Sequence, residues 1–572
     1  MEIRAGERPA DFIRISYERE MTAMKHRFLA LVLSAVLTLS LLPISAGAAG
    51  FRDVPSGSAL AGEVAKANAY GLMGGYNATT FGYADQMTRA QFITVLSRMM
   101  NWSSSTAGGS TQGVTDAMEL PAGISDTYFA AISAAARAGV VDTDRPFRPK
   151  DAITRAEMAE MLVRGLGLGG AAKLLEGREL PFTDVTSLRG YIAVAYAIGM
   201  TKGMTATTFA PDKTATRAQA AAMLVRIYEK LQTAGTGEEH GFYAISSYSQ
   251  IRLAEGMDSV SFGWSRMTWA DGAAKLTTTS VGGNEFFVPS GYETAVKALE
   301  QSGTARNLMV FMNTGAGLNE LLSSESGRAQ AVSEIVNELT VSYRALGRNP
   351  YTGVTIDFEG LYRAQKANFT AFLTVLRKEL TAAGKSLNVC VSPVLTTGTY
   401  YDGYDYRAIG QLADKVILMA YDYQAQDLSD YLGTEYYKTA AVAPLDQIFA
   451  SLLAITDAET GVEDASKILL GVQFQSIAWQ VDANGKLLSG TPVYPSEETL
   501  AKRLSQSGTV TGWSRDYQCP YVSYTTEDGS HWFAFYEDGD SLRAKCRAAA
   551  LLGVTGVSYW RLGLIPAERI GM

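Results

Sequence analysis

The 572-residue sequence predicts a multidomain protein in which three all-α repeats precede a C-terminal α/β domain, a (β/α)8 barrel. Three observations lead to this prediction. A tetrapeptide beginning Thr-Arg-Ala occurs three times in the first half at similar spacing, which indicates copies of one unit. In the second half, short β-rich runs alternate with helical patterns, as they do around parallel sheets. The length also exceeds what one hydrophobic core ordinarily supports.

Composition excludes several classes of function. Acidic residues outnumber basic residues by 58 to 50, which argues against a general nucleic-acid binder. The three cysteines, Cys390, Cys519 and Cys546, have no paired spacing, and only three histidines accompany them, so we predict no metal site and no cofactor. A bridge between Cys519 and Cys546 is the alternative to unpaired thiols, which we favour.

Residues 1–48 are expected to be an N-terminal extension and a signal peptide. Basic residues 25–27 precede the apolar run 28–42, and small residues up to Ala48 follow it. Met24 fits this signal as the start residue. A membrane anchor is the alternative, but the run is short and no basic flank follows it. We therefore expect secretion without a permanent membrane anchor.

Each repeat contains one tetrapeptide, and the three copies share one layout. In each copy, Thr followed three residues later by Gln or Glu predicts a capping box that opens an apolar helix, and a turn containing Phe comes before it. The tetrapeptides are at 88–91, 154–157 and 216–219, and the predicted repeats are 49–112, 113–175 and 176–232.

The arginine of each tetrapeptide is not explained by capping. Arg89, Arg155 and Arg217 would each lie in the first turn of a helix, where a cation opposes the helix dipole at a cost of about 0.3–1 kcal/mol. An anionic partner held by the guanidinium groups would supply a reason for all three. An inert helical spacer is the alternative.

These features together resemble S-layer homology repeats, because FRDV at 51–54 and FTDV at 182–185 accompany the aromatic turns and the Thr-Arg-Ala boxes. The resemblance implies pseudo-threefold assembly and non-covalent attachment to an anionic, commonly pyruvylated, secondary cell-wall polymer. By this resemblance the three arginines would contact the polymer's carboxylates. The second copy departs from the pattern, with GISDTY at 123–128.

A small polar segment, 233–240, is predicted to be a flexible linker, and residues 241–572 are predicted to form the barrel. A doubly wound open sheet is the alternative, but no Gly-rich phosphate loop follows the first strand. The eight predicted strands are 257–264, 284–289, 307–313, 353–360, 386–394, 415–423, 467–475 and 553–563.

The run GVTIDFEG at 353–360 places two carboxylates on one face of a strand. Side chains alternate along a strand, so Thr355, Asp357 and Glu359 would face the barrel interior. Glu359 would lie at the C-terminal end, where such barrels perform chemistry. Each carboxylate raises the pKa of the other, and a Glu that stays protonated near neutral pH is a general acid. Exposed acids at an ordinary strand end are the alternative.

Other strand ends supply groups suited to a sugar. Residues 419–422 add a phenol and a third acid, and Trp560 ends the last strand. Trp479 follows the seventh strand, with core packing as its alternative role. Aromatic faces stack on sugar C–H groups, and carboxylates accept hydrogen bonds from hydroxyl groups.

The C-terminal half resembles family 18 glycoside hydrolases of the cell-wall and spore-cortex N-acetylglucosaminidase type, through TGVTIDFE at 352–359, MAYD at 419–422 and Trp560. The resemblance implies substrate-assisted catalysis. Glu359 would be the acid and base, Asp357 would hold the acetamido N–H, and Tyr421 would bind its carbonyl oxygen. The predicted substrate-binding residues are Asp422, Trp560, Met419, Gln473 and Trp479.

Two departures from the family pattern have expected consequences. Thr352 and Thr355 replace the first two aspartates of the signature, so we expect Asp357 to titrate differently. Gln473 and Gln475 replace a Pro and a Tyr in the seventh strand, on the leaving-group side of the cleft.

The resulting hypothesis is a secreted glycosidase, non-covalently attached to the bacterial cell wall, that cleaves N-acetylglucosamine-containing polymers. Attachment favours peptidoglycan over chitin as the substrate. A carbohydrate-binding protein without turnover and a structural surface-layer protein are the alternatives. Retention of Glu359 argues against the first, and the large second half argues against the second.

Overall fold

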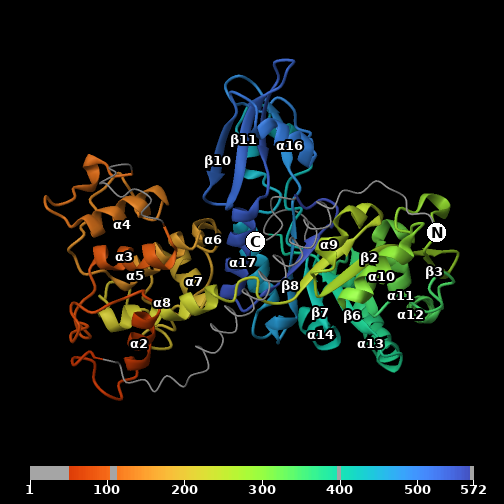
Figure 1. Ribbon diagram of the computed structural model, residues 1–572, viewed down its shortest axis with the longest axis horizontal. Coiled ribbons are helices and arrows are strands. Elements are labelled where there is room, and N and C mark those ends of the chain that lie inside the picture. Colours follow the sequence, from red (N-terminus) through yellow and green to blue (C-terminus); the bar gives the residue numbers. More distant parts are fainter. Residues whose placement is uncertain (1–49, 103–112, 396–400, 567–572) are drawn as a thin grey trace, which may run out of the picture.

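The computed structural model describes residues 50–102, 113–395 and 401–566. The predicted signal peptide and its cleavage position lie outside these ranges. Helices gather on one side of the molecule and a barrel on the other, with a small lobe beside them (Figure 1). No helix in the described ranges has both the length and the apolar character needed to cross a membrane.

The N-terminal part contains helices connected by loops that pair at single positions. Isolated β-bridges join Gln86 to Thr216, Thr88 to Ala152, and Thr154 to Thr214, so each repeat touches the other two. The helices are α2 (Ala61–Ala69), α3 (Arg89–Met99), α4 (Asp126–Arg137), α5 (Arg155–Gly165), α6 (Gly169–Leu174), α7 (Arg189–Ala197) and α8 (Arg217–Leu231).

The predicted capping boxes are confirmed. Thr88, Thr154 and Thr216 are the N-caps of α3, α5 and α8, and in each helix the Thr side chain accepts a hydrogen bond from the third backbone N–H. The Gln or Glu at that third position accepts a bond from the backbone N–H of the Thr. The sequence therefore fixes where these helices begin.

Eight parallel strands close into a barrel, since β1 pairs with both β13 and β2. The antiparallel hairpin strand β3 (Ala273–Thr277) extends from β2. The barrel strands are β1 (Glu239–Tyr243), β2 (Ser259–Ala270), β4 (Ala305–Asn313), β5 (Gly353–Glu359), β6 (Ser386–Val391), β7 (Lys415–Leu418), β8 (Ile468–Gln473) and β13 (Gly556–Trp560).

The other helices of the C-terminal part mostly connect these strands. They are α9 (Ile251–Ala254), α10 (Tyr292–Ser302), α11 (Leu318–Ser323), α12 (Glu325–Thr340), α13 (Lys366–Ala382), α14 (Tyr406–Leu412), α15 (Leu445–Ile455), α16 (Glu497–Leu504) and α17 (Gly539–Leu551). The predicted barrel is thus confirmed.

One predicted strand is wrong and one strand was missed. Residues 284–289 form no strand, because the Asn284 amide donates to three backbone carbonyls of its own loop and Pro289 has no N–H to pair. The first barrel strand is instead β1, whose first two residues were assigned to the linker. The barrel therefore begins at Glu239, and the connection after α8 spans only 232–238.

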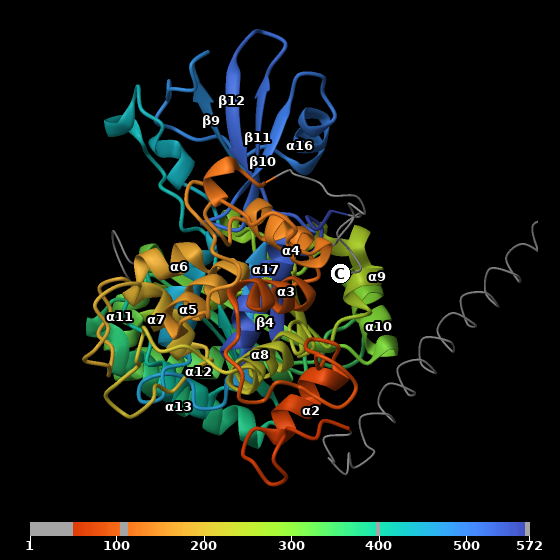
Figure 2. The same cartoon turned by 90° about the vertical axis from the view of Figure 1, so that its left-hand side faces the viewer.

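A four-stranded antiparallel lobe is inserted between β8 and α17 (Figure 2). Its strands are β9 (Ile477–Val481), β10 (Val510–Ser514), β11 (Cys519–Thr525) and β12 (His531–Phe535), in the order β10-β11-β12-β9. Trp479 lies in its core and is 0% exposed, in one cluster with Phe533 and Phe535. Core packing is therefore the role of Trp479.

The N-terminal part contacts the C-terminal part directly, and helix α17 of the C-terminal part lies at this contact (Figure 1). Lys230 of α8 donates to the carbonyl of Ile198 at 2.7 Å and to the carbonyl of Leu551 of α17 at 2.8 Å. Lys173 pairs with Asp516 of the lobe at 2.8 Å. The segment 232–238 thus joins two parts that are in contact, which differs from the flexible spacer that its composition predicts.

Candidate active site and wall-binding surface

Strand β5 presents its carboxylates to the barrel interior, as predicted. Phe358, on the opposite face, stacks on Phe372 of α13 with ring centroids 5.2 Å apart. Asp357 is only 2% exposed, and Glu359 at the end of the strand is partly exposed. The alternation of the strand therefore places apolar side chains under the outer helices and acids in the interior.

The pKa of Glu359 is raised. Burial raises its pKa to about 7, and the negative charge of Asp422 contributes to the rise. Asp422 follows β7 and accepts a hydrogen bond of 2.8 Å from the amide of Gln473 at the end of β8. The ends of β5, β7 and β8 thus meet near Glu359, whose pKa is perturbed.

Asp357 is buried more deeply than Glu359. Burial and the adjacent Glu359 hold its pKa well above the usual range, and the neighbouring Cys390 thiol of β6 offsets part of this rise. Its Oδ1 atom has no hydrogen-bond partner within the described ranges. A buried oxygen of this kind can accept an N–H from a substrate at little desolvation cost.

Tyr421 lies among these acids, and Trp560 lies beside a cavity. Burial holds the pKa of the Tyr421 phenol well above its usual range, with the charges of Cys390 and Asp357 adding to the effect, so the phenol stays protonated and can donate. Trp560 packs edge-on against Phe242 at 5.0 Å. Trp560 and Phe242 line a cavity of about 370 Å³, and Met309 is part of the same lining.

The structure brings most of the predicted site residues together. Met419 packs against the same interior cluster as Trp560 and Cys390. Trp479 is the exception, because it has no exposed face for a sugar. Cys390 was missed as a neighbour of Asp357, although its place on the interior face of the next strand could have suggested it.

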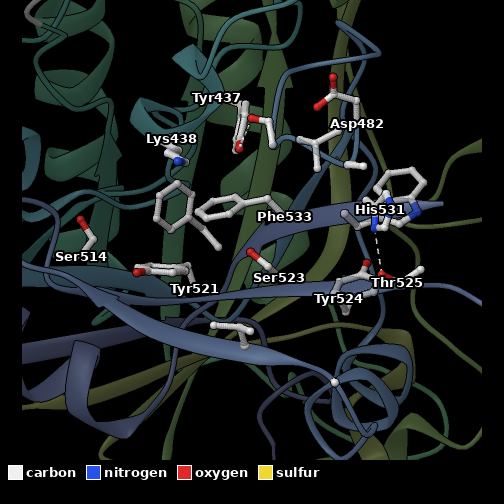
Figure 3. A pocket seen from close by; sticks show the side chains of 17 residues that line it. Tyr437, Lys438, Asp482, Ser514, Tyr521, Ser523, Tyr524, Thr525, His531 and Phe533 are labelled. Atoms are coloured by element: carbon white, nitrogen blue, oxygen red, sulfur yellow. Dashed lines mark hydrogen bonds between the residues drawn. The ribbon is translucent and has the colours of Figure 1, made fainter. Parts of the chain in front are cut away.

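A separate cavity of about 480 Å³ lies in the inserted lobe and does not include the carboxylates of the barrel. Figure 3 shows Tyr521 and Phe533 side by side, and His531 hydrogen-bonded to Thr525 at 2.9 Å. Tyr437 lies across from them. Neither this cavity nor the cavity beside Trp560 is lined by Asp357, Glu359 or Asp422.

In the N-terminal part, each tetrapeptide arginine reaches the aromatic turn of another repeat. The Nε atoms of Arg89, Arg155 and Arg217 donate to the carbonyls of Phe147, Phe209 and Phe81. All three arginines are at most 9% exposed. Their first role is therefore to join the repeats.

The charge environment differs among the three arginines. Arg89 forms an ion pair with Glu157 of the second repeat. Within the ranges that the structure describes, Arg155 and Arg217 form no ion pair with a carboxylate. Arg155 instead contacts the Thr201 hydroxyl at 3.1 Å, and Arg217 the Gly74 carbonyl at 2.9 Å.

The aspartates of the FRDV and FTDV motifs build the aromatic turns. Asp53 and Asp184 each accept a 2.8 Å bond from the backbone N–H of the turn phenylalanine in their own repeat. In the second repeat, which lacks the motif, the N–H of Phe147 donates to the Met118 carbonyl at 3.0 Å. In the second repeat, a backbone carbonyl therefore takes the place of the aspartate carboxylate.

Comparison with known proteins agrees with this architecture. The model of the S-layer homology domain matches residues 50–93, 122–159 and 181–221. The cortical fragment-lytic enzyme of Bacillus subtilis (strain 168) is 24% identical over 282 residues, which cover 47% of this chain and 60% of that protein. The chain therefore spans less than two thirds of the length of this relative.

Two solved structures resemble part of this chain. The spore cortex-lytic enzyme SleL of Bacillus cereus has 18% identity and a TM-score of 0.44, covering 57% of this chain and 71% of that one. A family 18 N-acetylglucosaminidase from Paenibacillus barengoltzii has 20% identity and a TM-score of 0.43, covering 58% of this chain and 97% of that one. The model of glycosyl hydrolases family 18 matches residues 265–564, more than half of the chain. The chain therefore belongs to glycosyl hydrolase family 18 and carries three S-layer homology repeats before its barrel.

Proposed function

We propose that this protein is a cell-wall-attached glycosidase that cleaves N-acetylglucosamine-containing polymers by substrate-assisted, retaining hydrolysis. The observation that carries the proposal is the pairing of Glu359, whose pKa is about 7, with the buried Asp357. A protonated Glu can give its proton to the glycosidic oxygen near neutral pH. An enzyme that needs only one acid plus helpers fits this arrangement.

In the first step, Glu359 donates its proton to the leaving-group oxygen while the substrate's acetamido carbonyl oxygen attacks the anomeric carbon. The glycosidic bond breaks and an oxazolinium ion forms. Asp357 accepts the acetamido N–H at Oδ1, the atom that lacks a protein partner. Tyr421 donates its phenolic O–H to the acetamido oxygen.

In the second step, the Glu359 carboxylate takes a proton from water, and the oxygen of that water attacks the anomeric carbon. The oxazolinium ring opens, the acetamido group is regenerated, and the configuration of the sugar is retained. Trp560, beside the cavity of about 370 Å³, offers a ring for stacking the sugar. Asp422 and Gln473 position the same sugar.

Peptidoglycan is the proposed substrate rather than chitin. A protein held against the wall meets peptidoglycan at high local concentration. The similarity to a cortical fragment-lytic enzyme supports the same choice. A binding protein without turnover is the alternative, and the proton donor that this chain retains argues against it.

The Glu359→Gln variant tests the acid. It should abolish release of reducing ends from de-O-acetylated peptidoglycan and from chitooligosaccharides, because an amide is too weak an acid to protonate the leaving group, while binding stays measurable. Glu498→Gln, at an exposed position in the lobe, is the control and should keep full activity. Equal turnover by Glu359→Gln and wild type would reject the assignment.

We further propose that the three repeats, with pseudo-threefold symmetry, hold an anionic secondary cell-wall polymer. The guanidinium groups of Arg155 and Arg217 support this, because neither forms an ion pair with a carboxylate of the described ranges. The Arg89 site already contains Glu157, so it should contribute least.

Retention on purified wall sacculi tests the attachment. Arg155→Ala together with Arg217→Ala should release the protein into the supernatant, whereas Arg89→Ala alone should leave most of it bound. Arg98→Ala is the control, because Arg98 on α3 also donates to a backbone carbonyl, that of Leu72. Circular dichroism checks that each variant is folded. Retention of the double variant would assign attachment to another surface.

A further inference from the structure

We infer that Arg266, on strand β2, is a specificity-determining residue that binds a carboxylate group of the glycan substrate. The inference rests on the proposed function and adds to it the residue that distinguishes a carboxylate-bearing chain, such as peptidoglycan, from a neutral chain, such as chitin. In peptidoglycan the carboxylate comes from the lactyl ether of N-acetylmuramic acid or from the stem peptide. Arg266 lies beyond the predicted strand 257–264, and no motif in the sequence marks it.

A shift of register in β2 turns the Arg266 side chain toward the barrel interior. Phe262 and Trp264 face outward and are buried, and Trp264 packs edge-on against a tyrosine of α10. Between Phe262 and Ser265 the pairing with β4 slips by one residue, and Arg266 then lies opposite Phe311, which packs against the interior cluster. The extra residue therefore turns inward a side chain that strict alternation would place outside.

The same register places Arg266 at the level of the proposed catalytic acids. Phe311 of β4 lies opposite Arg266 on one side and opposite Asp357 of β5 on the other. Neighbouring strands lie about 4.8 Å apart, so Arg266 and Asp357 are two spacings, or about 10 Å, apart along the barrel wall. Arg266 can therefore contact a substituent of a glycan bound at Glu359 without pairing with the acids themselves.

The guanidinium group of Arg266 has no anionic partner in the part of the chain that the structure describes. It forms no ion pair there, and its Nε atom is buried without a hydrogen-bond acceptor. Glu285, which lines the cavity beside Trp560, does not pair with it. A buried N–H group without an acceptor is costly, so its presence indicates a place where an oxygen of a ligand fits.

Aromatic rings hold this guanidinium group beside the cleft. Its Cζ atom lies 5.6 Å from the centroid of the Phe311 ring, and Phe311 stacks on Phe286 with centroids 4.8 Å apart. Phe286 lines the cavity of about 370 Å³ that Trp560 also lines. The planar fork of N–H donors on an arginine matches the two oxygens of a carboxylate, whereas a neutral hydroxyl offers one oxygen and no charge. The ligand chemistry is therefore a carboxylate carried by the bound sugar chain.

The test is the ratio of kcat/KM on peptidoglycan strands to kcat/KM on a neutral chitooligosaccharide. One preparation of strands is treated with an amidase, which frees the lactyl carboxylates. The other keeps its stem peptides, so that the lactyl groups are amides and the peptides carry the carboxylates. For Arg266→Gln the ratio should fall about tenfold or more on at least one preparation, because a hydrogen bond between charged groups is lost. The preparation that shows the fall identifies the source of the carboxylate, and an unchanged ratio on both would overturn the inference.

Two further variants control for charge and for the mutation itself. Arg266→Lys keeps the charge but lacks the planar fork, so its ratio should lie between those of the wild type and Arg266→Gln. Arg344→Gln, which changes an exposed arginine in the connection before β5, should keep the wild-type ratio. Melting temperatures check that each variant is folded, and Arg266→Lys serves as the test variant if Arg266→Gln is not.

Binding without turnover separates this inference from the proposed function. In the Glu359→Gln background, adding Arg266→Gln should raise the Kd for strands stripped of secondary polymer about tenfold, with no comparable rise for the chitooligosaccharide. If Glu359→Gln is inactive and Arg266→Gln binds and cleaves like its parent, the inference fails and the proposed function stands. If Glu359→Gln turns over like the wild type, the proposed catalytic role fails, and the comparison of Kd values still decides the role of Arg266.

Discussion

At the scale of residues, the site is a cluster of three carboxylates, and burial is the largest cause of the raised pKa values of Asp357 and Glu359. Asp357 and Glu359 lie two positions apart on β5, and Asp422 follows β7. Among the residues that the structure describes, no cation contributes to the shifted pKa of either β5 acid. Burial first, and repulsion between the carboxylates second, therefore keep protons in the cluster near neutral pH.

The Asp422→Asn variant tests this repulsion. Burial first and Asp422 second raise the pKa of Glu359 to about 7, so wild-type activity should fall as pH rises through about 7. Removing the negative charge lowers that pKa, and the alkaline limb of kcat/KM should move to lower pH by about one unit. A limb that stays in place would show that burial alone sets the pKa.

Cys390 shows what strand patterning can reveal at this scale. Alternation along 353–360 predicted which acids face inward, because that rule is local. The neighbour of Asp357 depends on the register between two strands separated by a helix, and no local rule supplies it.

At the scale of elements, helix α17 connects the inserted lobe to the last barrel strand. Its Lys545 and the preceding Glu537 form an ion pair in which the residues are 2% and 4% exposed. Burying two charges is costly, so the pair is stabilising only while both partners are present. This pair fixes the point at which the chain returns from the lobe to the barrel.

The Lys545→Met variant should lower the free energy of unfolding by about 3–5 kcal/mol, because it leaves the Glu537 carboxylate buried without its cation. Calorimetry would measure the loss as a lower melting temperature. The double variant Glu537→Gln with Lys545→Met should recover much of it. Equal melting temperatures for Lys545→Met and wild type would show that the pair contributes nothing.

At the scale of the whole molecule, the wall-binding part and the barrel form direct contacts instead of being separated by a free linker. Lys230 connects the carbonyls of Ile198 and Leu551, one from each part, and desolvation lowers its pKa. These contacts hold the S-layer homology repeats in one orientation relative to the barrel.

The Lys230→Ala variant should loosen this contact. Limited proteolysis should then cut within 232–238, which should resist cleavage in the wild type because both sides are packed. Lys202→Ala, an exposed lysine of the same repeat, should behave like the wild type. Identical cleavage of Lys230→Ala and wild type would mean that this lysine does not hold the parts together.

The sequence by itself determined the three repeats, the capping boxes that begin α3, α5 and α8, the barrel, and the strand that carries Glu359. These features follow from periodicity and capping, which act within a few residues. The tertiary structure decided the rest: β1 in place of 284–289, Trp479 in the core of the lobe, Glu157 beside Arg89, and Cys390 beside Asp357. Each depends on which distant segments pack together, because burial and hydrogen bonding are properties of the assembled chain rather than of its local pattern.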